Sequence, residues 1–514
     1  MDKIQLYGVF QKSFSGLNSS DPVKFEATFK NGEEKFTIKL FLCGENTYMV
    51  RFMPQKAGQW DYIIDLDGKI VKDSFLCEGK EENNHGLVQT VGDRFRYEDK
   101  TRYLPFGTTC YAWIHQTPEL QLKTLETLEA SPFNKIRMCV FPKSMPYNNN
   151  EPELFPFYKN PDGSWNVSRS NEYFWLHLEN RIRQLAGLGI EADLILFHPY
   201  DRWGFSEFTH KEDLIYLQYC IVRLSAFHNI WWSLANEFDF VPGKTMEDWN
   251  DFGNMILKED IYHHLTSIHN GFIMYPKKEW MTHCSIQSGE IRKVVTWKNQ
   301  YQLPVVIDEC GYEGDIEYSW GNITAFELVH RIWTAVTRGG YCTHGETFHR
   351  DDEILWWAKG GVLYGQSPQR IAFLRKLLVG IPEDLHLMQI NMFNINPNEH
   401  SDSSSVDTNN PIARSLLSLP EAERNEHLLN FIPNILCSAS YRLHYLGRQC
   451  PSIMEFQVPE NGKYRIEVID IWDMKRTVAE ENTAGKIKLK LPGKEGITLL
   501  VTRLEGDSLE GKTV

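Results

Sequence analysis

The sequence predicts an α/β protein in which a (β/α)₈ TIM barrel is flanked by N-terminal and C-terminal antiparallel β-sandwich domains. Three observations predict this class: short alternating strands before residue 85, strands interleaved with helical periodicity from about residue 95 to 380, and renewed alternation beyond residue 434. We expect four segments: a sandwich at 1–85, the barrel at 86–395, a polar loop and connector at 396–433, and a second sandwich at 434–514.

Composition limits the classes of protein and partner. A chain of 514 residues is too long for one core, and 42% hydrophobic residues suffice for several. The net charge of -14 disfavours nucleic acid and anionic membranes as partners. No apolar run reaches the roughly 20 residues that span a bilayer. The opening MDKIQLYGVFQKSF lacks the apolar core of a secretory signal, and the ten cysteines are scattered singly, so we expect a reducing, cytoplasmic setting.

The first sandwich is predicted from alternating runs that turn signals separate, with no helical pattern between them. The runs are VKFEATF (23–29), EKFTIKLFL (34–42), YMVRFM (48–53) and QWDYII (59–64).

The barrel is predicted from eight strand candidates, most of them followed by a helical pattern. The strands are expected at 103–109, 135–141, 192–198, 230–236, 266–274, 284–288, 304–309 and 340–346. Clear helical periodicity covers 170–189, 212–228, 323–340 and 367–380. An open doubly wound sheet is the alternative, but no Gly-x-Gly-x-x-Gly follows any strand. The gap between the fifth and sixth strands is too short for a full helix.

The C-terminal part begins with a polar, low-complexity loop at 397–410 and continues as the second sandwich. Its strands are expected in ASYRLHYL, IMEFQV, YRIEVIDIW, KIKLKL and ITLLVTRL. Docking on the barrel, glycan binding and homo-oligomer formation are all open roles for the sandwiches, and we expect the first.

Two predicted barrel strands end in a glutamate. The stretch WWSLANEFD (231–239) places Glu237 after an apolar run, and LPVVIDECGYEG (303–314) does the same for Glu309. Because barrel chemistry lies at the carboxyl ends of the strands, we expect a paired-carboxylate site. Other polar residues expected there are Arg137, Asn236, His198, His269, Asn270, Gln287, His344 and Glu346. This set suits a polyhydroxylated substrate, and no cofactor motif accompanies it.

The motifs LANE and VIDE resemble those of the clan A retaining glycoside hydrolases. In that clan the fourth-strand glutamate is the general acid/base and the seventh-strand glutamate is the nucleophile. The resemblance therefore implies acid/base catalysis by Glu237 and nucleophilic attack by Glu309. It also implies that Asn236 binds the sugar 2-hydroxyl and that Arg137 lies beneath the nucleophile.

The whole layout is also similar to a bacterial glycoside hydrolase family with an N-terminal sandwich, a barrel and a C-terminal sandwich. The segments YMVRFMPQKAGQWDY, LPFGTTCYAWIHQ, WWSLANEFD, THCSIQ and VIDECGYEGD carry this similarity. One departure concerns the sixth strand, where the clan often has a tyrosine and this chain offers Gln287. Support for the nucleophile is therefore expected from elsewhere.

Some residues have a structural alternative. Strand alternation predicts that Asp308 points away from Glu309 and is structural. Glu346 fits substrate binding or a salt bridge equally well. His344, Glu346 and His349 suggest a metal site, but their spacing matches no zinc motif, so we expect no metal. His198 and His269 are expected to donate to sugar hydroxyls or to be satisfied core residues.

Aromatic residues near the predicted strand ends are candidates for contact with the sugar, although aromatics fill cores more often. They are Trp113, Trp203, Trp320, Trp356 and Trp357, of which about two are expected to touch substrate. The long loop at 142–170, with Tyr147, is expected to close one end of the site and favour exo action.

We therefore expect a cofactor-free retaining β-glycosidase that releases a terminal sugar from small glycosides or oligosaccharides. A non-catalytic carbohydrate-binding barrel and, less favoured, a metal-dependent hydrolase are the alternatives.

Overall fold

The computed structural model describes residues 2–388 and 410–510, which form two compact units. The first unit comprises 1–287, 301–322 and 343–364, and the second comprises 288–300, 323–342 and 365–514. Most of the predicted polar loop at 397–410 lies outside the described residues. Among the described residues, no helix combines the length and apolarity that crossing a membrane takes.

The first unit begins with a seven-stranded sheet in the order β1-β7-β6-β3-β4-β5-β2. Its neighbours pair antiparallel except β1 and β7, which are parallel. Residues alternate between buried and exposed along β6, as the period of two predicts. Buried aromatic rings, among them those of Phe29, Phe52 and Phe75, form the core of this sheet. The strands are β1 (Asp2–Leu6), β2 (Phe10–Ser15), β3 (Val23–Asn31), β4 (Glu34–Leu42), β5 (Thr47–Phe52), β6 (Gly58–Leu66) and β7 (Lys69–Lys80).

The barrel strands follow, after a small sheet of β8 (Val88–Val91), β9 (Arg94–Tyr97) and β10 (Arg102–Tyr103). Every residue of β15 and β16 is buried, which is typical of parallel strands covered on both faces. The barrel strands of this unit include β11 (Gly107–Thr109), β12 (Lys135–Cys139), β15 (Glu191–Phe197), β16 (Ile230–Ala235), β17 (Thr266–Ser267), β18 (Cys284–Gln287) and β19 (Val305–Glu309).

Hydrogen bonds inside the first unit close these strands into a barrel. Strands β11, β12, β15, β16 and β17 pair in parallel in that order, and a parallel bridge between His269 and Ser285 leads on to β18 and β19. The Thr343 N–H donates to the Ile307 carbonyl at 2.9 Å. A parallel bridge between Thr108 and His344 then returns to β11. The predicted (β/α)₈ fold class is confirmed.

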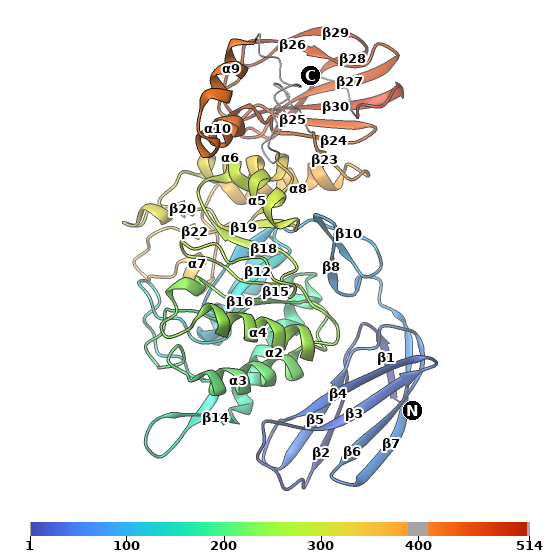
Figure 1. The fold of residues 1–514 in the computed structure, drawn as a ribbon, viewed down its shortest axis with the longest axis vertical. Coiled ribbons are helices and arrows are strands. Elements are labelled where there is room, and N and C mark those ends of the chain that lie inside the picture. The colour runs from blue at the N-terminus through green and yellow to red at the C-terminus, as the bar shows by residue number, and fades with distance from the viewer. Residues whose placement is uncertain (1, 389–409, 511–514) are drawn as a thin grey trace. The chain divides into compact units, whose positions relative to one another are not determined.

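Helices of the first unit cover the outside of these strands (Figure 1). Helices α3 and α4 begin at capping boxes, in which the side chain of Thr209 or Thr245 and a carboxylate three residues later satisfy backbone N–H groups. No helix lies between β17 and β18, where residues 268–283 are all described. The helices are α1 (Pro118–Glu129), α2 (Glu172–Gly187), α3 (His210–Leu224), α4 (Met246–Glu259) and the short α7 (Trp356–Lys359).

A buried ionic network joins the N-terminal sheet to the barrel helices within the first unit. Glu179 on α2 accepts from Arg51 on β5 at 2.7 Å through both of its oxygens. The Arg223 guanidinium on α3 donates to the same carboxylate at 2.5 Å. All three side chains are buried. The Glu179 carboxylate and the more exposed carboxylate of Glu172 together balance the charges of the two guanidinium groups.

We expect Glu179→Ala to lower the free energy of unfolding by about 3–5 kcal/mol, because it leaves two buried guanidinium groups without their shared carboxylate. Urea denaturation checks this. The matched control is Glu126→Ala, which removes an exposed partner of Lys123 and should change stability by less than about 1 kcal/mol. Equal effects of the two substitutions would contradict the structural role of the network.

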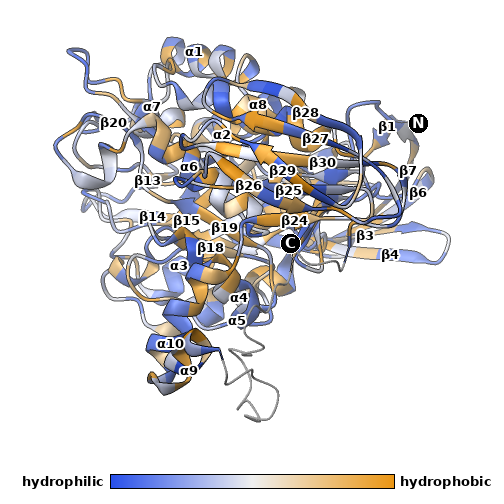
Figure 2. Cartoon of the chain, turned by 90° about the horizontal axis from the view of Figure 1, so that it is seen from above, coloured by the Kyte–Doolittle hydropathy of each residue, from blue (hydrophilic) through white to orange (hydrophobic). Residues whose placement is uncertain are grey.

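The second unit contains a six-stranded sheet, β23-β24-β25-β30-β27-β28, and a two-stranded sheet of β26 and β29. Phe456 and Leu489 of the small sheet share a core with Ile466 and Val501 of the large one, which makes this part a sandwich. Figure 2 shows hydrophobic stretches along β25, β27 and β30. The strands are β23 (His386–Leu387), β24 (Ile435–Cys437), β25 (Tyr441–Tyr445), β26 (Ile453–Gln457), β27 (Gly462–Asp470), β28 (Lys475–Thr483), β29 (Lys486–Lys490) and β30 (Ile497–Gly506).

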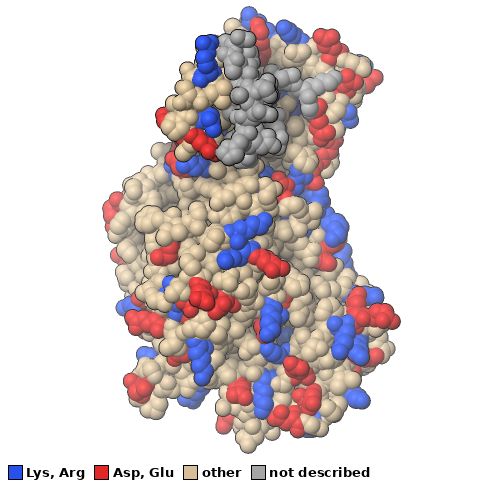
Figure 3. Space-filling model, in the orientation of Figure 1, with Lys and Arg blue, Asp and Glu red and all other residues tan. Residues whose placement is uncertain are grey.

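The second unit also holds most of the later helices. The connector predicted at 396–433 contains two of them, α9 and α10, which the sequence did not predict. Asn410 caps α9 by accepting from the Ile412 and Ala413 N–H groups. The helices are α5 (Val294–Tyr301), α6 (Ala325–Thr337), α8 (Ser367–Val379), α9 (Pro411–Ser418) and α10 (Glu421–Leu428). Positive and negative side chains are interspersed on the face that Figure 3 shows.

Candidate active site

The two glutamates lie at carboxyl ends of barrel strands, as predicted. Glu309 is the last residue of β19, and Glu237 follows β16 by two residues. Glu237 is 6% exposed, and the Glu309 side chain keeps 14% of its surface accessible. Both carboxylates are thus mostly withdrawn from water, which makes their ionisation sensitive to neighbouring charges.

The Asn236 side chain links the surroundings of the two carboxylates. Its Nδ2 donates to Glu237 Oε2 at 2.9 Å. Its Oδ1 accepts from the Tyr111 hydroxyl and from Arg137 Nη2, each at 3.2 Å. The Tyr111 hydroxyl has one hydrogen, which it shares between Asn236 Oδ1 and Glu309 Oε1. One amide and one phenol therefore connect Glu237 to Glu309, so the glutamates share one site although 72 residues separate them in the sequence numbering.

A second tyrosine holds the other carboxylate. The Tyr200 hydroxyl, in the loop after β15, donates to Glu237 Oε2, the same oxygen that Asn236 reaches. Tyr111 contacts Oε1 of Glu309, and the same oxygen lies 3.5 Å from Arg137 Nη1. Each carboxylate thus has one oxygen held by the side chains named here.

Arg137 lies beneath Glu309, inside the barrel. Its Nε is 3.8 Å from Asp193 Oδ2 and 3.9 Å from Asp308 Oδ1. Lys135 Nζ donates to the same two aspartates at 2.6 and 2.9 Å. Two cations and two aspartates therefore form a compensated buried network, and Arg137 adds positive potential at Glu309 above it.

The structure corrects the expected orientation of Asp308. Simple alternation would direct Asp308 and Glu309 to opposite faces, yet both approach the Arg137 guanidinium. The register of β18 against β19 shifts between Ile286 and Gln287. Such an irregularity changes the direction of side chains at a strand end, which explains how consecutive acids reach one interior. Asp308 nevertheless lies in the buried network, consistent with a structural role.

Lys143, in the loop after β12, is a buried cation near both glutamates. Its Nζ lies 3.4 Å from the Tyr111 ring centroid and 4.2 Å from the Tyr200 ring centroid. Burial lowers the pKa of its ammonium, while the charges of Glu237 and Glu309 oppose that shift. The aromatic faces stabilise the cation between the two tyrosines that hold the carboxylates.

The pKa values of the two glutamates move in opposite directions. Burial and the neighbouring Glu309 raise the pKa of Glu237, although Lys143 opposes the shift. For Glu309, burial acts upward, but His269, Arg137 and Lys143 together with the Tyr111 hydrogen bond lower its pKa. Burial lowers the pKa of His269 to about 4, so near neutral pH the positive charge beside Glu309 comes from Arg137 and not from His269.

The Glu237 backbone adopts a left-handed conformation, with φ 50° and ψ 57°. This region costs a residue with a side chain on the order of 1 kcal/mol. The Glu237 N–H donates to His269 Nδ1 at 3.4 Å, and the His269 Nε2 lies 3.9 Å from Glu309 Oε1. His269 therefore links the strained backbone of one glutamate to the carboxylate of the other.

Of the other predicted polar residues, Gln287 and Asn270 lie near the glutamates, whereas His198 contacts the backbone after β12. Gln287 pairs with Glu309 across β18 and β19, and its amide lowers the pKa of Glu237. Asn270 Oδ1 accepts from the Gln287 N–H at 3.1 Å. His198 is buried, with its Nε2 3.2 Å from the Phe141 carbonyl and its Nδ1 without a hydrogen-bond partner among the described residues. Burial lowers the pKa of His198 to about 3.

Two predicted sugar-contacting tryptophans lie in the core instead of at the surface. Trp113 is fully buried and donates to the Met138 sulfur at 2.9 Å. Trp356 is 1% exposed and donates to Thr108 Oγ1 at 2.8 Å. The sequence marks both as close to strand ends but does not say which way each ring points. Trp203 remains accessible in part, and its Nε1 donates to Glu151 at 3.1 Å.

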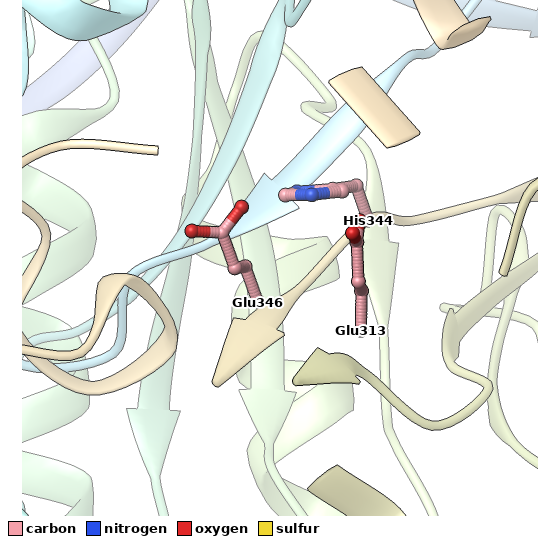
Figure 4. Close-up of side chains that lie close together, drawn as sticks. All are labelled: Glu313, His344 and Glu346. Atoms are coloured by element: carbon pink, nitrogen blue, oxygen red, sulfur yellow. The ribbon is translucent and has the colours of Figure 1, made fainter. Parts of the chain in front are cut away.

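His344 and Glu346 form a buried cluster with Glu313 rather than with His349. One potential ligand atom from each of the three lies within 4.8 Å of the others (Figure 4). His344 contacts Thr108 Oγ1 through Nδ1 at 2.9 Å, and Glu346 accepts the Tyr364 N–H at 2.6 Å. Thr108 and Tyr364 thus engage one atom each of His344 and Glu346, while His344 Nε2 has no hydrogen-bond partner among the described residues.

The loop at 142–170 folds partly into a hairpin of β13 (Phe157–Lys159) and β14 (Trp165–Ser170). Before the hairpin, the Tyr147 hydroxyl donates to Glu317, in the segment after β19. The Tyr147 ring also lies against His349, with 6.0 Å between ring centroids. The loop after the second barrel strand therefore reaches the segments after the seventh and eighth. The same region holds Trp357, which packs with Trp320 and against the Tyr111 ring.

Sequence reasoning missed Tyr111, Lys143 and Tyr200. Each follows a predicted barrel strand closely, in TTCY, FPK and FHPY respectively. This position was the available signal, because loops at the carboxyl ends of barrel strands carry functional residues. Tyr111 supplies a phenol that contacts Glu309 Oε1.

Comparisons with known proteins agree with this geometry. Residues 90–363 match the family described as "Apiosidase-like, catalytic domain". Two domains of unknown function match residues 3–67 (DUF5060) and 432–502 (DUF5605). A crystal structure titled "putative glycoside hydrolase", from Bacteroides vulgatus ATCC 8482, is 33% identical with a TM-score of 0.85, over 98% of this chain and 100% of that one.

A glycoside hydrolase family 5 structure from the same organism is 14% identical with a TM-score of 0.57, over 82% of this chain and 94% of that one, and shows the shared fold. No curated protein matches the chain. The family match extends over more than half of the chain and contains both glutamates. The protein therefore belongs to the glycoside hydrolases with an apiosidase-like catalytic domain.

Proposed function

We propose that the protein is a retaining, exo-acting β-glycosidase in which Glu309 is the nucleophile and Glu237 the general acid/base. The observation that carries this proposal is the hydrogen-bonded connection from Glu237 through Asn236 and Tyr111 to Glu309. It places both carboxyl groups in one site, and double displacement requires them to be about 5–5.5 Å apart.

In the first half-reaction, Glu309 Oε2 attacks the anomeric carbon while the glycosidic C–O bond breaks. Tyr111 and Arg137 act on Oε1, which leaves Oε2 to form the new bond. Asn236 and Tyr200 donate to Glu237 Oε2, so the acidic proton is carried on Oε1. That proton moves to the leaving oxygen and produces an alcohol.

In the second half-reaction, the ionised Glu237 takes a proton from water as the water oxygen attacks the anomeric carbon. The ester bond to Glu309 breaks, and its carboxylate returns. The raised pKa of Glu237 depends partly on the charge of Glu309, which is absent in the ester. The pKa of Glu237 therefore falls in the glycosyl-enzyme, so its carboxylate is ionised and can accept the proton of water.

The stereochemical course tests this proposal directly. We expect proton NMR of a reaction in progress to show first the sugar anomer with the configuration of the substrate. The opposite anomer as the first product would overturn the retaining assignment. Because the chain's family is described as apiosidase-like, aryl apiosides are the first substrates to assay, followed by other aryl glycosides.

The proposed exo action rests on the loop at 142–170, whose Tyr147 reaches Glu317. The release of one sugar at a time from an oligosaccharide supports it, and cleavage at internal bonds contradicts it. Small glycosides or oligosaccharides are the proposed partners. We propose a cytoplasmic location because none of the ten cysteines, all within the described residues, forms a disulfide.

We expect Tyr111→Phe to lower kcat/KM about 10–100-fold, because a hydrogen bond to a charged group contributes about 1.5–3 kcal/mol. The Tyr111 hydroxyl lowers the pKa of Glu309, so its removal should raise that pKa. The acidic limb of the kcat/KM profile, where Glu309 becomes protonated as pH falls, should therefore move to higher pH. Tyr216→Phe is the control: this buried hydroxyl donates to the Leu196 carbonyl, and its loss should leave the limb in place.

A further inference from the structure

An exposed apolar group stands beside the proposed acid/base. Phe240, Phe272 and Ile273 are 37%, 85% and 60% exposed, and we refer to them as the aromatic rim. Phe240 lies three residues after Glu237, and its N–H donates to the Glu237 carbonyl at 2.9 Å. Phe272 and Ile273 follow Asn270 in the loop after β17. The rim thus belongs to the loops after the fourth and fifth barrel strands.

The backbone of the rim is held firmly. The Asp239 carboxylate accepts the N–H groups of Gly271, Phe272 and Ile273 at 2.5, 2.7 and 2.8 Å. Three hydrogen bonds to one charged acceptor fix this turn, because charge-assisted bonds are the strong ones. The loop that carries the most exposed phenylalanine is therefore locked to the residue that precedes Phe240.

The two rings of the rim are also placed specifically. Phe240 and Phe272 make an edge contact with 5.1 Å between ring centroids and 67° between planes. A Cβ on Gly271 would lie 2.4 Å from Cζ of Phe240, so the ring of Phe240 occupies the space that any side chain at 271 would need. Gly271 therefore permits the close approach of the two loops.

Folding gains little from this arrangement. Burying a phenylalanine side chain stabilises a protein, whereas Phe272 is left almost fully in water. A rigid, exposed aromatic pair instead lowers the entropic cost of binding a flat apolar group. Phe240 is bonded through its N–H to the Glu237 carbonyl, so the rim belongs to the same strand-end loops as the proposed acid/base.

We propose that the aromatic rim is a leaving-group subsite, which binds the apolar face of the ring attached to the glycosidic oxygen. The inference rests on the proposed function, since only the acid/base role of Glu237 defines the leaving-group side. The ligand chemistry is a ring with an apolar face, supplied either by the C–H face of a second sugar or by an aryl aglycone.

The test compares wild type and Phe272→Ala on three glycosides of the sugar that the enzyme releases: a 4-nitrophenyl glycoside, a disaccharide and the methyl glycoside. We expect kcat/KM to fall about 3–10-fold for the leaving groups that contain a ring and to stay unchanged for the methyl glycoside. A loss only with the 4-nitrophenyl glycoside assigns the subsite to aryl groups, and a loss only with the disaccharide assigns it to a sugar. Equal losses on all three, or no loss on either ring, would overturn the proposal.

Two further variants make the comparison specific. Phe272→Trp should restore activity on the ring-bearing substrates because it keeps an aromatic face. Tyr173→Ala removes a 71% exposed aromatic side chain from α2, outside the site, and should change none of the three rates. Sedimentation velocity on wild type and Phe272→Ala adds a check: self-association lost in the variant would assign the rim to an interface and overturn the subsite.

A binding measurement separates this inference from the proposed function. Saturation-transfer NMR with 4-nitrophenol and with a free monosaccharide should show contact with wild type for at least one probe, and a reduced signal with Phe272→Ala. If wild type hydrolyses no glycoside, the proposed function fails while this signal still reports on the rim. If hydrolysis proceeds but neither probe loses signal in the variant, the subsite fails and the glycosidase assignment stands.

Discussion

Replacing Glu309 with alanine is expected to lower the kcat for an activated aryl glycoside by about 10⁴-fold or more, the scale seen when a covalent nucleophile is removed. Such a loss corresponds to about 5.5 kcal/mol of transition-state stabilisation. The physical reason is that no other group can form the glycosyl ester, while Tyr111 and Arg137 would then surround an empty anion position. Steady-state release of nitrophenol measures the effect.

Azide provides the control for this variant. A small anion can enter the space that the carboxylate vacates and attack the anomeric carbon, so added azide should restore part of the turnover and yield a glycosyl azide. Rescue would show that the fold and the acid/base remain intact. Activity close to wild type in Glu309→Ala without azide would contradict the nucleophile assignment.

Replacing Glu237 with alanine is expected to affect substrates according to their leaving groups. For a poor leaving group such as a sugar or an alkoxide, kcat/KM should fall about 10²–10⁴-fold, because general acid catalysis is lost. For a dinitrophenolate, which leaves without a proton, the glycosyl-enzyme should still form. Its hydrolysis then slows, since no base activates the water, so stopped-flow kinetics should show a burst followed by slow turnover.

The neighbouring acid provides a matched control. Asp239 lies two residues from Glu237 but uses its carboxylate to hold backbone N–H groups after β17. Asp239→Asn leaves Glu237 in place as the proton donor, so whatever it does to the binding of the leaving group it should keep the wild-type dependence on leaving-group pKa, whereas Glu237→Ala should steepen that dependence. The same dependence in wild type and Glu237→Ala would contradict the acid/base assignment.

Sequence reasoning predicted the architecture and the two glutamates because both depend on local patterns. Buried parallel strands appear as continuous apolar runs. A carboxylate at the end of such a run is expected at the strand-end face of a barrel. Arg137 and Asn236 could be added because Arg137 lies in β12 and Asn236 directly follows β16. The resemblance to a glycoside hydrolase family rested on segments that include these strand ends, such as WWSLANEFD and VIDECGYEGD.

Side-chain direction and long-range pairing could not be predicted in the same way. The register shift between Ile286 and Gln287, which brings Asp308 and Glu309 to one guanidinium, depends on the partner strand and leaves no signal in the sequence of β19. Trp113 and Trp356 occupy core positions for a related reason, since a residue near a strand end can turn inward or outward. Tyr111 and Tyr200 lie in loops whose conformations depend on the whole barrel.

The left-handed backbone at Glu237 has a consequence for evolution and engineering. Glycine would occupy that conformation with less backbone strain. The residue proposed to carry the proton therefore costs the fold some stability. Selection for heat resistance alone would not protect this glutamate, so thermostable variants should be screened for turnover at every round.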